Sequence, residues 1–272
     1  MNIIIDGREC SCERGEFLLQ VARRNGIFVP SLCYHEGLGG LAACRVCIVE
    51  ILERDRRRIV ASCIYPIENE IEVFTQSDAV LEQRGIVLTL LARLAPGARV
   101  IQQMARANGV EIPLLTDKKD GDTCILCGRC TTACDLLGSG AIAKINRGIT
   151  KVVDTPYSKA SLECIGCASC AQVCPTDSIP FTETESTVNI WGRTFELQTC
   201  ERCGCFISTD ELIAKASLLC EVADAGEAYS AGEAPDAGAV PDAEATHEVD
   251  ATLCSECRRQ AIADTLRIGF KP

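Results

Sequence analysis

The first third of the chain alternates short apolar runs with turn residues. Residues 3–5 are three isoleucines followed by Asp6–Gly7, a pattern that predicts a strand leading into a hairpin. Residues 17–25 carry apolar side chains at helical spacing and are followed by Gly26, which favours a short helix. Further strands are predicted within residues 46–54, 58–63 and 71–76. A hairpin, a helix and more strands in this order favour a β-grasp domain over residues 1–76.

Helical periodicity replaces the strand pattern in the middle of the chain. Residues 77–94 and 98–108 are each predicted to form a helix, because their apolar positions recur at helical spacing. Pro96–Gly97 separates the two, and this pair of residues interrupts helices. We assign both to a helical segment over residues 77–116, which contains no candidate metal ligand.

The second half of the chain has a weaker pattern. Residues 141–153 predict a short hairpin within a segment that spans residues 117–185. Residues 186–272 are expected to form a C-terminal module, interrupted by residues 224–248, which are acidic and rich in Ala, Gly and Pro. Such a composition buries too little apolar surface to fold, so this insert is predicted to be disordered. The whole chain is predicted to be an α+β protein.

Cysteine content changes this picture. The 272-residue chain has 20 cysteines, and their tight C-x-x-C grouping favours metal-bound thiolates in a reduced compartment over a disulfide scaffold. The N-terminus lacks the basic and apolar regions of a signal peptide, so a cytoplasmic location is expected. The net charge of −11 argues against binding to nucleic acid or to an anionic membrane surface. No apolar run approaches the roughly 18 residues of a membrane span.

Two cysteine runs of identical spacing carry the strongest chemical signal. The stretches CILCGRCTTAC, residues 124–134, and CIGCASCAQVC, residues 164–174, both follow the spacing C-x2-C-x2-C-x3-C. In bacterial ferredoxins such a run holds a [4Fe–4S] cluster with its first three cysteines, and its fourth cysteine ligates the other cluster. Zinc sites, the alternative, seldom use four cysteines in one contiguous run. One cluster is therefore predicted on Cys124, Cys127, Cys130 and Cys174, and the other on Cys164, Cys167, Cys170 and Cys134.

Four cysteines of the first segment are spaced for a different cluster. They are separated by wide and uneven intervals, and the glycines at 37, 39 and 40 leave the intervening loop free to wrap around an inorganic group. A [2Fe–2S] cluster is predicted on Cys33, Cys44, Cys47 and Cys63. Cys10 and Cys12 lack partners at ligand spacing and are expected to be small packing residues.

The C-terminal module carries two widely separated C-x-x-C pairs, Cys200 with Cys203 and Cys254 with Cys257. Two such pairs are typical of a zinc ribbon, and a structural zinc is the prediction for these four residues. The alternatives are a third [4Fe–4S] cluster, to which Cys220 would contribute, and free thiols. Cys205 could compete for the metal, whereas His247 lies in the predicted disordered insert and is not expected to be a ligand.

The first segment resembles the start of the large iron–sulfur subunit of respiratory complex I and the diaphorase subunits of NAD-linked hydrogenases. The resemblance rests on GIFVPSLCYHEGLGGLAACRVCIVEI, residues 26–51, and covers roughly residues 1–75. In those proteins a cluster held by one histidine and three cysteines follows, but residues 64–123 contain neither residue type. That cluster is therefore not expected here. His35 stands in the family's CYH sequence and is expected to hydrogen-bond near the cluster without ligating it.

The two-run segment resembles the two-cluster domain of iron-only hydrogenases and related formate dehydrogenases. The matching features are the two runs, the NRG sequence at residues 146–148 and the CPT sequence at residues 174–176. The C-terminal cysteine pairs resemble the tail of some formate hydrogenlyase iron–sulfur subunits. These resemblances imply a hydrogenase, a transhydrogenase or a formate dehydrogenase complex, including electron-bifurcating ones.

Several predicted metal centres in one chain favour electron transfer over catalysis. The glycine-rich residues 37–41 lack the strand–helix context of a nucleotide site. We expect a non-catalytic wire subunit of a flavin-containing NAD(P)-linked oxidoreductase, such as a bifurcating hydrogenase or a transhydrogenase. Its expected partners are a flavoprotein that oxidises NAD(P)H and a second redox subunit. The alternatives are the electron-transfer subunit of a molybdenum or tungsten formate dehydrogenase, and a free multi-cluster ferredoxin carrier. An iron–sulfur regulator is disfavoured because no basic DNA-reading helix is predicted.

Overall fold

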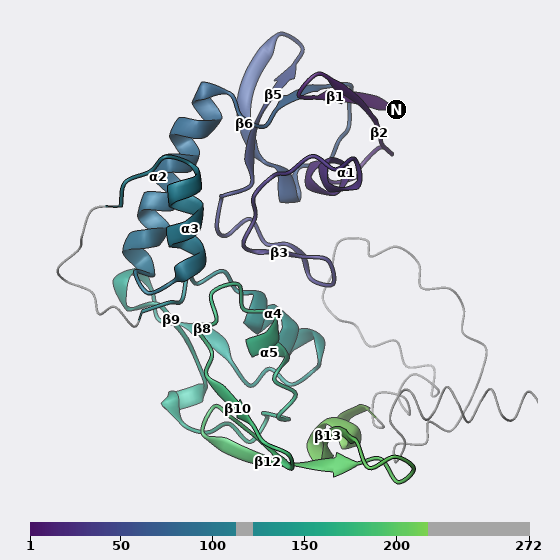
Figure 1. Ribbon diagram of the computed structural model, residues 1–272, viewed down its shortest axis with the longest axis vertical. Coiled ribbons are helices and arrows are strands. Elements are labelled where there is room, and N and C mark those ends of the chain that lie inside the picture. The colour runs from purple at the N-terminus through teal and green to yellow at the C-terminus, as the bar shows by residue number, and fades with distance from the viewer. Residues whose placement is uncertain (113–121, 217–272) are drawn as a thin grey trace, which may run out of the picture. The chain divides into compact units, whose positions relative to one another are not determined.

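The computed structural model describes residues 1–112 and 122–216 (Figure 1). The chain divides into two compact units. The first comprises Met1–Ser158 and Ser169–Pro180, and the second comprises Lys159–Ala168 with the residues from Phe181 onward. Among the described helices, none combines the length and the apolar character that crossing a membrane requires.

A five-stranded sheet forms the first part of the first unit. Its strands are β1 (Asn2–Ile5), β2 (Arg8–Ser11), β5 (Ile48–Glu53), β6 (Arg56–Ala61) and β7 (Glu72–Phe74), in the order β2-β1-β7-β5-β6. Strands β1 and β7 are parallel, and the other neighbours are antiparallel. Ile3 and Ile5 are buried and Ile4 is exposed, as the alternation of a strand requires. Helix α1 (Leu18–Arg24) buries its apolar residues in the same core.

The positions of these elements agree with the hydrophobic pattern. Strands β5 and β7 and helix α1 lie within their predicted ranges, while β6 begins two residues before its range. Between α1 and β5 the chain forms a short antiparallel ribbon of β3 (Tyr34–His35) and β4 (Gly39–Gly40). A single 3-10 turn, η1 (Ser62–Ile64), follows β6.

Both predicted helices of the middle segment are present, as α2 (Asp78–Leu94) and α3 (Arg99–Ala107). The Ser77 hydroxyl accepts a hydrogen bond from the backbone N–H of Val80 at 3.4 Å and caps α2. Leu88 of α2 and Ile101 of α3 belong to a second apolar core. That core also contains the predicted ligands Cys33, Cys44 and Cys127, so the helices share a core with the candidate site.

The remainder of the first unit is built from short elements. They are helix α4 (Arg129–Leu136), strands β8 (Ala143–Ile145) and β9 (Val152–Asp154), the turns η2 (Gly148–Thr150) and η3 (Pro156–Ser158), and helix α5 (Ser169–Gln172). Helices α4 and α5 pack against each other. Strands β8 and β9 pair antiparallel and confirm the hairpin predicted within residues 141–153.

The second unit contains a four-stranded antiparallel sheet that the sequence pattern did not predict. Its strands are β10 (Phe181–Glu183), β11 (Thr187–Ile190), β12 (Arg193–Thr199) and β13 (Phe206–Thr209), in that order. Residues 210–216 continue as a helix. Val188, Ile190 and Phe195 are the buried apolar residues of this sheet. The predicted disordered insert at residues 224–248 lies outside the described residues.

Candidate iron–sulfur centres

The four cysteines predicted to hold a [2Fe–2S] cluster converge on one buried place in the first unit. Cys33 precedes β3, Cys44 and Cys47 precede β5, and Cys63 lies in η1. All four are almost fully buried. The sulfurs of Cys33 and Cys44, of Cys33 and Cys63, and of Cys47 and Cys63 lie within hydrogen-bonding reach of each other. The fold therefore gathers four thiols in one buried place.

Hydrogen bonds between the cysteine side chains are the largest cause of the shifts in their pKa. Cys44 as a hydrogen-bond donor lowers the pKa of Cys33 to about 2, and Cys63 lowers the pKa of Cys47 to about 7. The same contacts raise the pKa of Cys44 and Cys63 above that of a free thiol, Cys33 being the first cause in both cases. Four buried thiolates together would repel one another. A cationic iron centre removes this conflict, because metal binding takes up deprotonated thiols.

Backbone N–H groups surround the same sulfurs. The Cys44 N–H donates to the Cys33 sulfur at 3.5 Å, and the N–H of Ala43 also points at Cys33. The N–H groups of Val46 and Leu32 point at Cys44. Hydrogen bonds of this kind to sulfur stabilise the anionic form and tune the potential of iron–sulfur centres. The donor set therefore fits a cluster.

His35 and the neighbouring glycines shape the loop around this site. The imidazole Nδ1 of His35 accepts a hydrogen bond from the Gly37 N–H at 3.2 Å. Gly40 lies against Cys63, where any Cβ would overlap the Cys63 carbonyl oxygen. The loop can close over Cys63 because position 40 has no side chain.

The first run of the two-cluster segment has its cysteines at the start of α4. Cys127 and Cys130 are buried, and Cys124 is half-buried. Burial raises the pKa of Cys124 and Cys127, and the nearby Cys174 thiolate raises each further. Burial is also the main cause that raises the pKa of Cys130 to about 12. The first unit thus brings Cys174, from the second run, beside the three leading cysteines of the first run.

Sulfur-directed N–H groups recur in this segment. The Leu126 N–H donates to Cys124 at 3.4 Å, the Ala141 N–H to Cys134 at 3.3 Å and the Ser178 N–H to Cys174 at 3.3 Å. The Nε atom of Arg129 is buried and has no hydrogen-bond partner in the part of the chain that the structure describes. Inorganic sulfide or a thiolate is an acceptor that such a donor requires.

The second set is divided between the two units. Cys134 on α4 and Cys170 on α5 belong to the first unit, where these two helices are in contact. Cys164 and Cys167 belong to the second unit, and Cys164 is buried. The structure therefore describes Cys134 and Cys170 within one unit, and Cys164 and Cys167 within the other.

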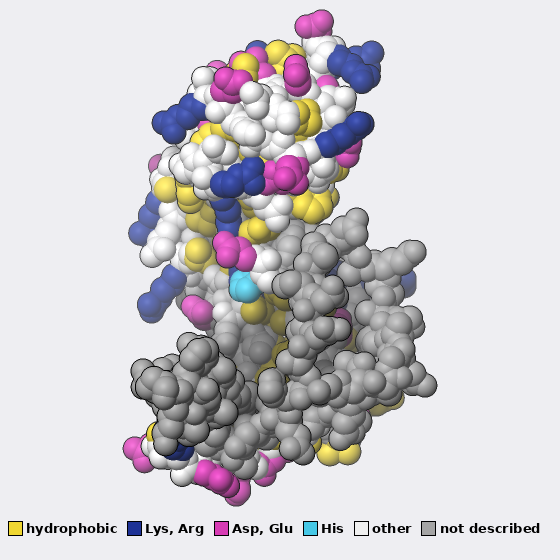
Figure 2. All heavy atoms as spheres, turned by 90° about the vertical axis from the view of Figure 1, so that its right-hand side faces the viewer, with side chains coloured by type: hydrophobic (Ala, Val, Ile, Leu, Met, Phe, Trp, Pro, Cys, Tyr) yellow, Lys and Arg dark blue, Asp and Glu magenta, His cyan; other side chains and the backbone are white. Residues whose placement is uncertain are grey.

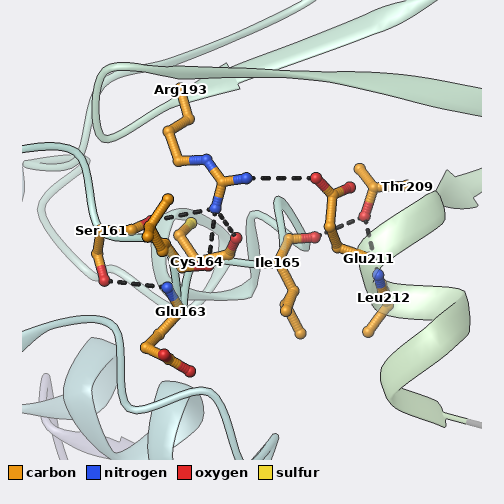
Figure 3. A network of polar contacts seen from close by, with 9 residues as sticks. Ser161, Glu163, Cys164, Ile165, Arg193, Thr209, Glu211 and Leu212 are labelled. Atoms are coloured by element: carbon orange, nitrogen blue, oxygen red, sulfur yellow. Dashed lines mark hydrogen bonds and ion pairs between the residues drawn. The ribbon is translucent and has the colours of Figure 1, made fainter.

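Arg193 of β12 holds the loop that carries Cys164 (Figure 3). Its Nη1 donates to the carbonyl oxygens of Ser161 at 3.1 Å and of Cys164 at 2.6 Å, and its Nη2 pairs with Glu211 at 3.3 Å. The Thr209 hydroxyl donates to the Ile165 carbonyl at 2.5 Å. The sheet of the second unit thus fixes the backbone around a predicted ligand. Sequence reasoning missed Arg193, because its partners lie about thirty residues away along the chain.

Cys200, Cys203 and Cys205 lie at the turn between β12 and β13. Their sulfurs are all within 4.8 Å of one another, and those of Cys203 and Cys205 are 3.2 Å apart. The Gly204 N–H donates to the Cys200 carbonyl at 2.8 Å, with Gly204 in the left-handed region at φ 72°. The structure therefore gathers Cys205, predicted only as a competitor, with the first predicted pair. Cys220, Cys254, Cys257 and His247 lie outside the described residues.

Two of the candidate centres are neighbours within the first unit. Cys33 and Cys44 share one apolar core with Cys127. Burial is the main cause that raises the pKa of Cys127, and Cys174, Cys124 and Cys33 raise it further. Arg129, directly after the CILCG stretch, donates from Nη1 to the carbonyl of Leu32 at 3.1 Å. This contact ties the residue before Cys33 to the start of α4.

Comparison with known proteins identifies two iron–sulfur domains in the chain. Residues 1–78 match a 2Fe-2S iron-sulfur cluster binding domain, and residues 118–181 match a 4Fe-4S dicluster domain. The chain is 32% identical over 210 residues to the NADP-reducing hydrogenase subunit HndD of Solidesulfovibrio fructosivorans, which covers 66% of this chain and 36% of that subunit. It is 27% identical to the NADPH-Fe(3+) oxidoreductase subunit alpha of Geobacter sulfurreducens, covering 76% and 27%.

The chain therefore spans about a third of the length of these curated relatives. Among solved structures, an NAD+-reducing [NiFe]-hydrogenase in the H2-reduced state has a similar fold. The TM-score is 0.55 at 24% identity, over 65% of this chain and 85% of the matched chain. The chain is an iron–sulfur electron-transfer protein that contains a [2Fe–2S] and a [4Fe–4S] dicluster domain and is homologous to subunits of NAD(P)-linked hydrogenases and oxidoreductases.

Proposed function

We propose that this chain is the electron wire of a flavin-containing NAD(P)-linked oxidoreductase, such as a bifurcating hydrogenase or a transhydrogenase. A flavoprotein partner would oxidise NAD(P)H and pass single electrons to the chain, because a one-electron cluster cannot accept a hydride. A second redox subunit would take the electrons onward. The names of the homologous subunits, which belong to NADP-reducing and NADPH-oxidising enzymes, support this proposal.

The observation that carries the proposal is the adjacency of two centres in the first unit. The [2Fe–2S] ligands Cys33 and Cys44 share a core with Cys127 of the first [4Fe–4S] set. Helices α2 and α3 follow the [2Fe–2S] domain along the chain, yet the two proposed centres on either side of them are neighbours. Electrons would therefore pass from the [2Fe–2S] domain, a β-grasp domain by its strand order, directly to the dicluster domain.

The proposed ligand sets are those predicted from spacing. Cys33, Cys44, Cys47 and Cys63 would hold the [2Fe–2S] cluster, and Cys124, Cys127, Cys130 and Cys174 would hold one [4Fe–4S] cluster. Cys164, Cys167, Cys170 and Cys134 would hold the other. The gathered sulfurs, the N–H groups aimed at them and the position of Cys174 support the first two sets.

The function is tested with the isolated chain and with the native complex. Dithionite should reduce the clusters of the isolated chain, whereas NADH and NADPH should not reduce them, because no flavin is bound. The same chain purified natively should elute from gel filtration with a flavoprotein in fixed stoichiometry, and NAD(P)H should then reduce the clusters. Elution as a lone chain without flavoprotein would favour a free carrier and overturn the wire proposal.

Metal analysis tests the cofactors. We expect about ten irons per reconstituted chain, from one [2Fe–2S] and two [4Fe–4S] clusters, and about one zinc at the C-terminal cysteines. About fourteen irons without zinc would assign a third [4Fe–4S] cluster to this region. Fewer than ten irons in a fully reconstituted sample would contradict the cluster count.

Two variants locate the zinc. The proposed ligands are Cys200, Cys203, Cys254 and Cys257, so the double variant C254S/C257S should lose zinc and C205S should retain it. The sulfur of Cys205 is nevertheless close to those of Cys200 and Cys203. Loss of zinc in C205S with retention in C254S/C257S would transfer the site to these three residues.

A further inference from the structure

Arg84 of α2 is a buried cation that forms no ion pair with any described acidic residue. Only 3% of its surface is exposed. Its Nε donates to the Val46 carbonyl at 3.2 Å, and its Nη2 donates to the carbonyls of Ile48 at 2.8 Å and Thr75 at 3.1 Å. Within the part of the chain that the structure describes, the five ion pairs do not include Arg84. Its guanidinium therefore has hydrogen-bond acceptors, but no described carboxylate neutralises its positive charge.

Some exposed arginines of the first unit do have acidic partners. Arg14 pairs with Glu68, and Arg58 pairs with Glu53. On the face that Figure 2 shows, basic and acidic side chains of the coloured part are interspersed. An arginine remains charged in proteins, and a buried charge without a counter-charge is strongly destabilising. A buried anion near Arg84 would therefore stabilise the folded chain.

Arg84 binds the backbone on both sides of a predicted [2Fe–2S] ligand. Val46 and Ile48, whose carbonyls it holds, are the two chain neighbours of Cys47. Cys47 is fully buried. Burial lowers the pKa of Arg84, and the charge of Cys47 acts in the opposite direction. No other described charged group has a resolved effect on Arg84.

We propose that Arg84 is the buried counter-charge of the [2Fe–2S] centre and that it raises the reduction potential of that centre. This inference rests on the proposed ligation by Cys33, Cys44, Cys47 and Cys63. Reduction adds one negative charge to a cluster that four thiolates already make anionic. A fixed positive charge at Cys47 stabilises the reduced form more than the oxidised form. Arg84 thus acts as a positioning and charge-supplying residue that makes the first electron acceptor easier to reduce.

The test compares three variants of the full-length, anaerobically reconstituted chain. R84Q removes the charge but retains amide donors, R84K retains the charge, and R93Q removes an exposed charge from the same helix. A redox titration followed by EPR measures the potential of the [2Fe–2S] signal. In R84Q we expect the equilibrium constant for reduction to fall about tenfold or more, which is about 59 mV for a one-electron couple. R93Q should match the unchanged chain, and R84K should stay within about threefold of it.

The outcomes distinguish an effect of the positive charge of Arg84 from an effect of its hydrogen-bond geometry. An intact [2Fe–2S] spectrum in R84Q with an unchanged potential overturns the proposal. An equal shift in R84Q and R84K also overturns it, because the hydrogen-bond geometry would then be the cause. If R84Q does not retain the cluster, a tenfold fall in R84K overturns the proposal and an unchanged potential supports it. Absence of a [2Fe–2S] signal in the unchanged chain would instead refute the ligand set of the proposed function.

Discussion

Replacing Cys134 with alanine is expected to destroy the [4Fe–4S] centre built on Cys164, Cys167 and Cys170. The centre built on Cys124 should remain. The fourth cysteine of such a run is separated from the third by three residues and reaches the neighbouring cluster, because it lies too far along α4 to close the same cube. Iron content should fall by about four per chain, and one of the two [4Fe–4S] EPR signals should disappear.

The reciprocal variant provides the matched control. Cys174→Ala should remove the centre built on Cys124 and retain the other, because Cys174 lies beside Cys124 and Cys127 in the first unit. Cys10→Ala, which changes a buried cysteine outside the proposed ligand sets, should affect neither signal. Loss of the Cys124 centre in the Cys134 variant would mean that each run closes on itself.

The first unit was largely predictable because its signals are local. Three consecutive isoleucines before a turn predict a strand with two buried positions, and Ile3 and Ile5 occupy them. The two helices of the middle segment follow from helical spacing and from the Pro96–Gly97 interruption. Cysteine spacing singled out four cysteines that converge near β3 and η1. The strand and helix inferences use residues that are close together along the chain. The cysteine inference instead joins distant residues such as Cys33 and Cys63, and it succeeds because the residue type itself marks them.

The sheet of the second unit was missed because its strands are short and rich in polar residues. Strand β10 is exposed at every position, and β12 buries only Phe195. The alternation of Val188 and Ile190 was the one available signal. The roles of Arg84 and Arg193 were beyond sequence reasoning for another reason. Arg84 binds carbonyl groups that lie 38 and 36 residues away, and Arg193 binds one that lies 29 residues away, so no local pattern marks either residue.

Replacing Gly40 with alanine is expected to prevent assembly of the [2Fe–2S] centre. A Cβ at this position would overlap the Cys63 carbonyl oxygen and lie 2.8 Å from the carbonyl carbon. These are backbone atoms, so relieving the clash requires moving β4 or Cys63, a proposed ligand. Overpacking of this kind costs about 1–3 kcal/mol, and here the displaced atoms belong to the site itself. Visible absorption and EPR of the reconstituted chain should show loss of the [2Fe–2S] signal and retention of both [4Fe–4S] signals.

Gly37→Ala is the matched control in the same loop. Its Cβ would have only ordinary contacts, at 3.6 and 3.7 Å, with the His35 ring, and its backbone is outside the left-handed region. This variant should assemble the [2Fe–2S] centre normally. Gly39→Ala distinguishes backbone strain from steric overlap. At this position the φ of 71° strains an alanine, while no atom lies within 4 Å of the added Cβ. A full [2Fe–2S] signal in Gly40→Ala would show that Cys63 can move without loss of the cluster, and would argue against Cys63 as a ligand.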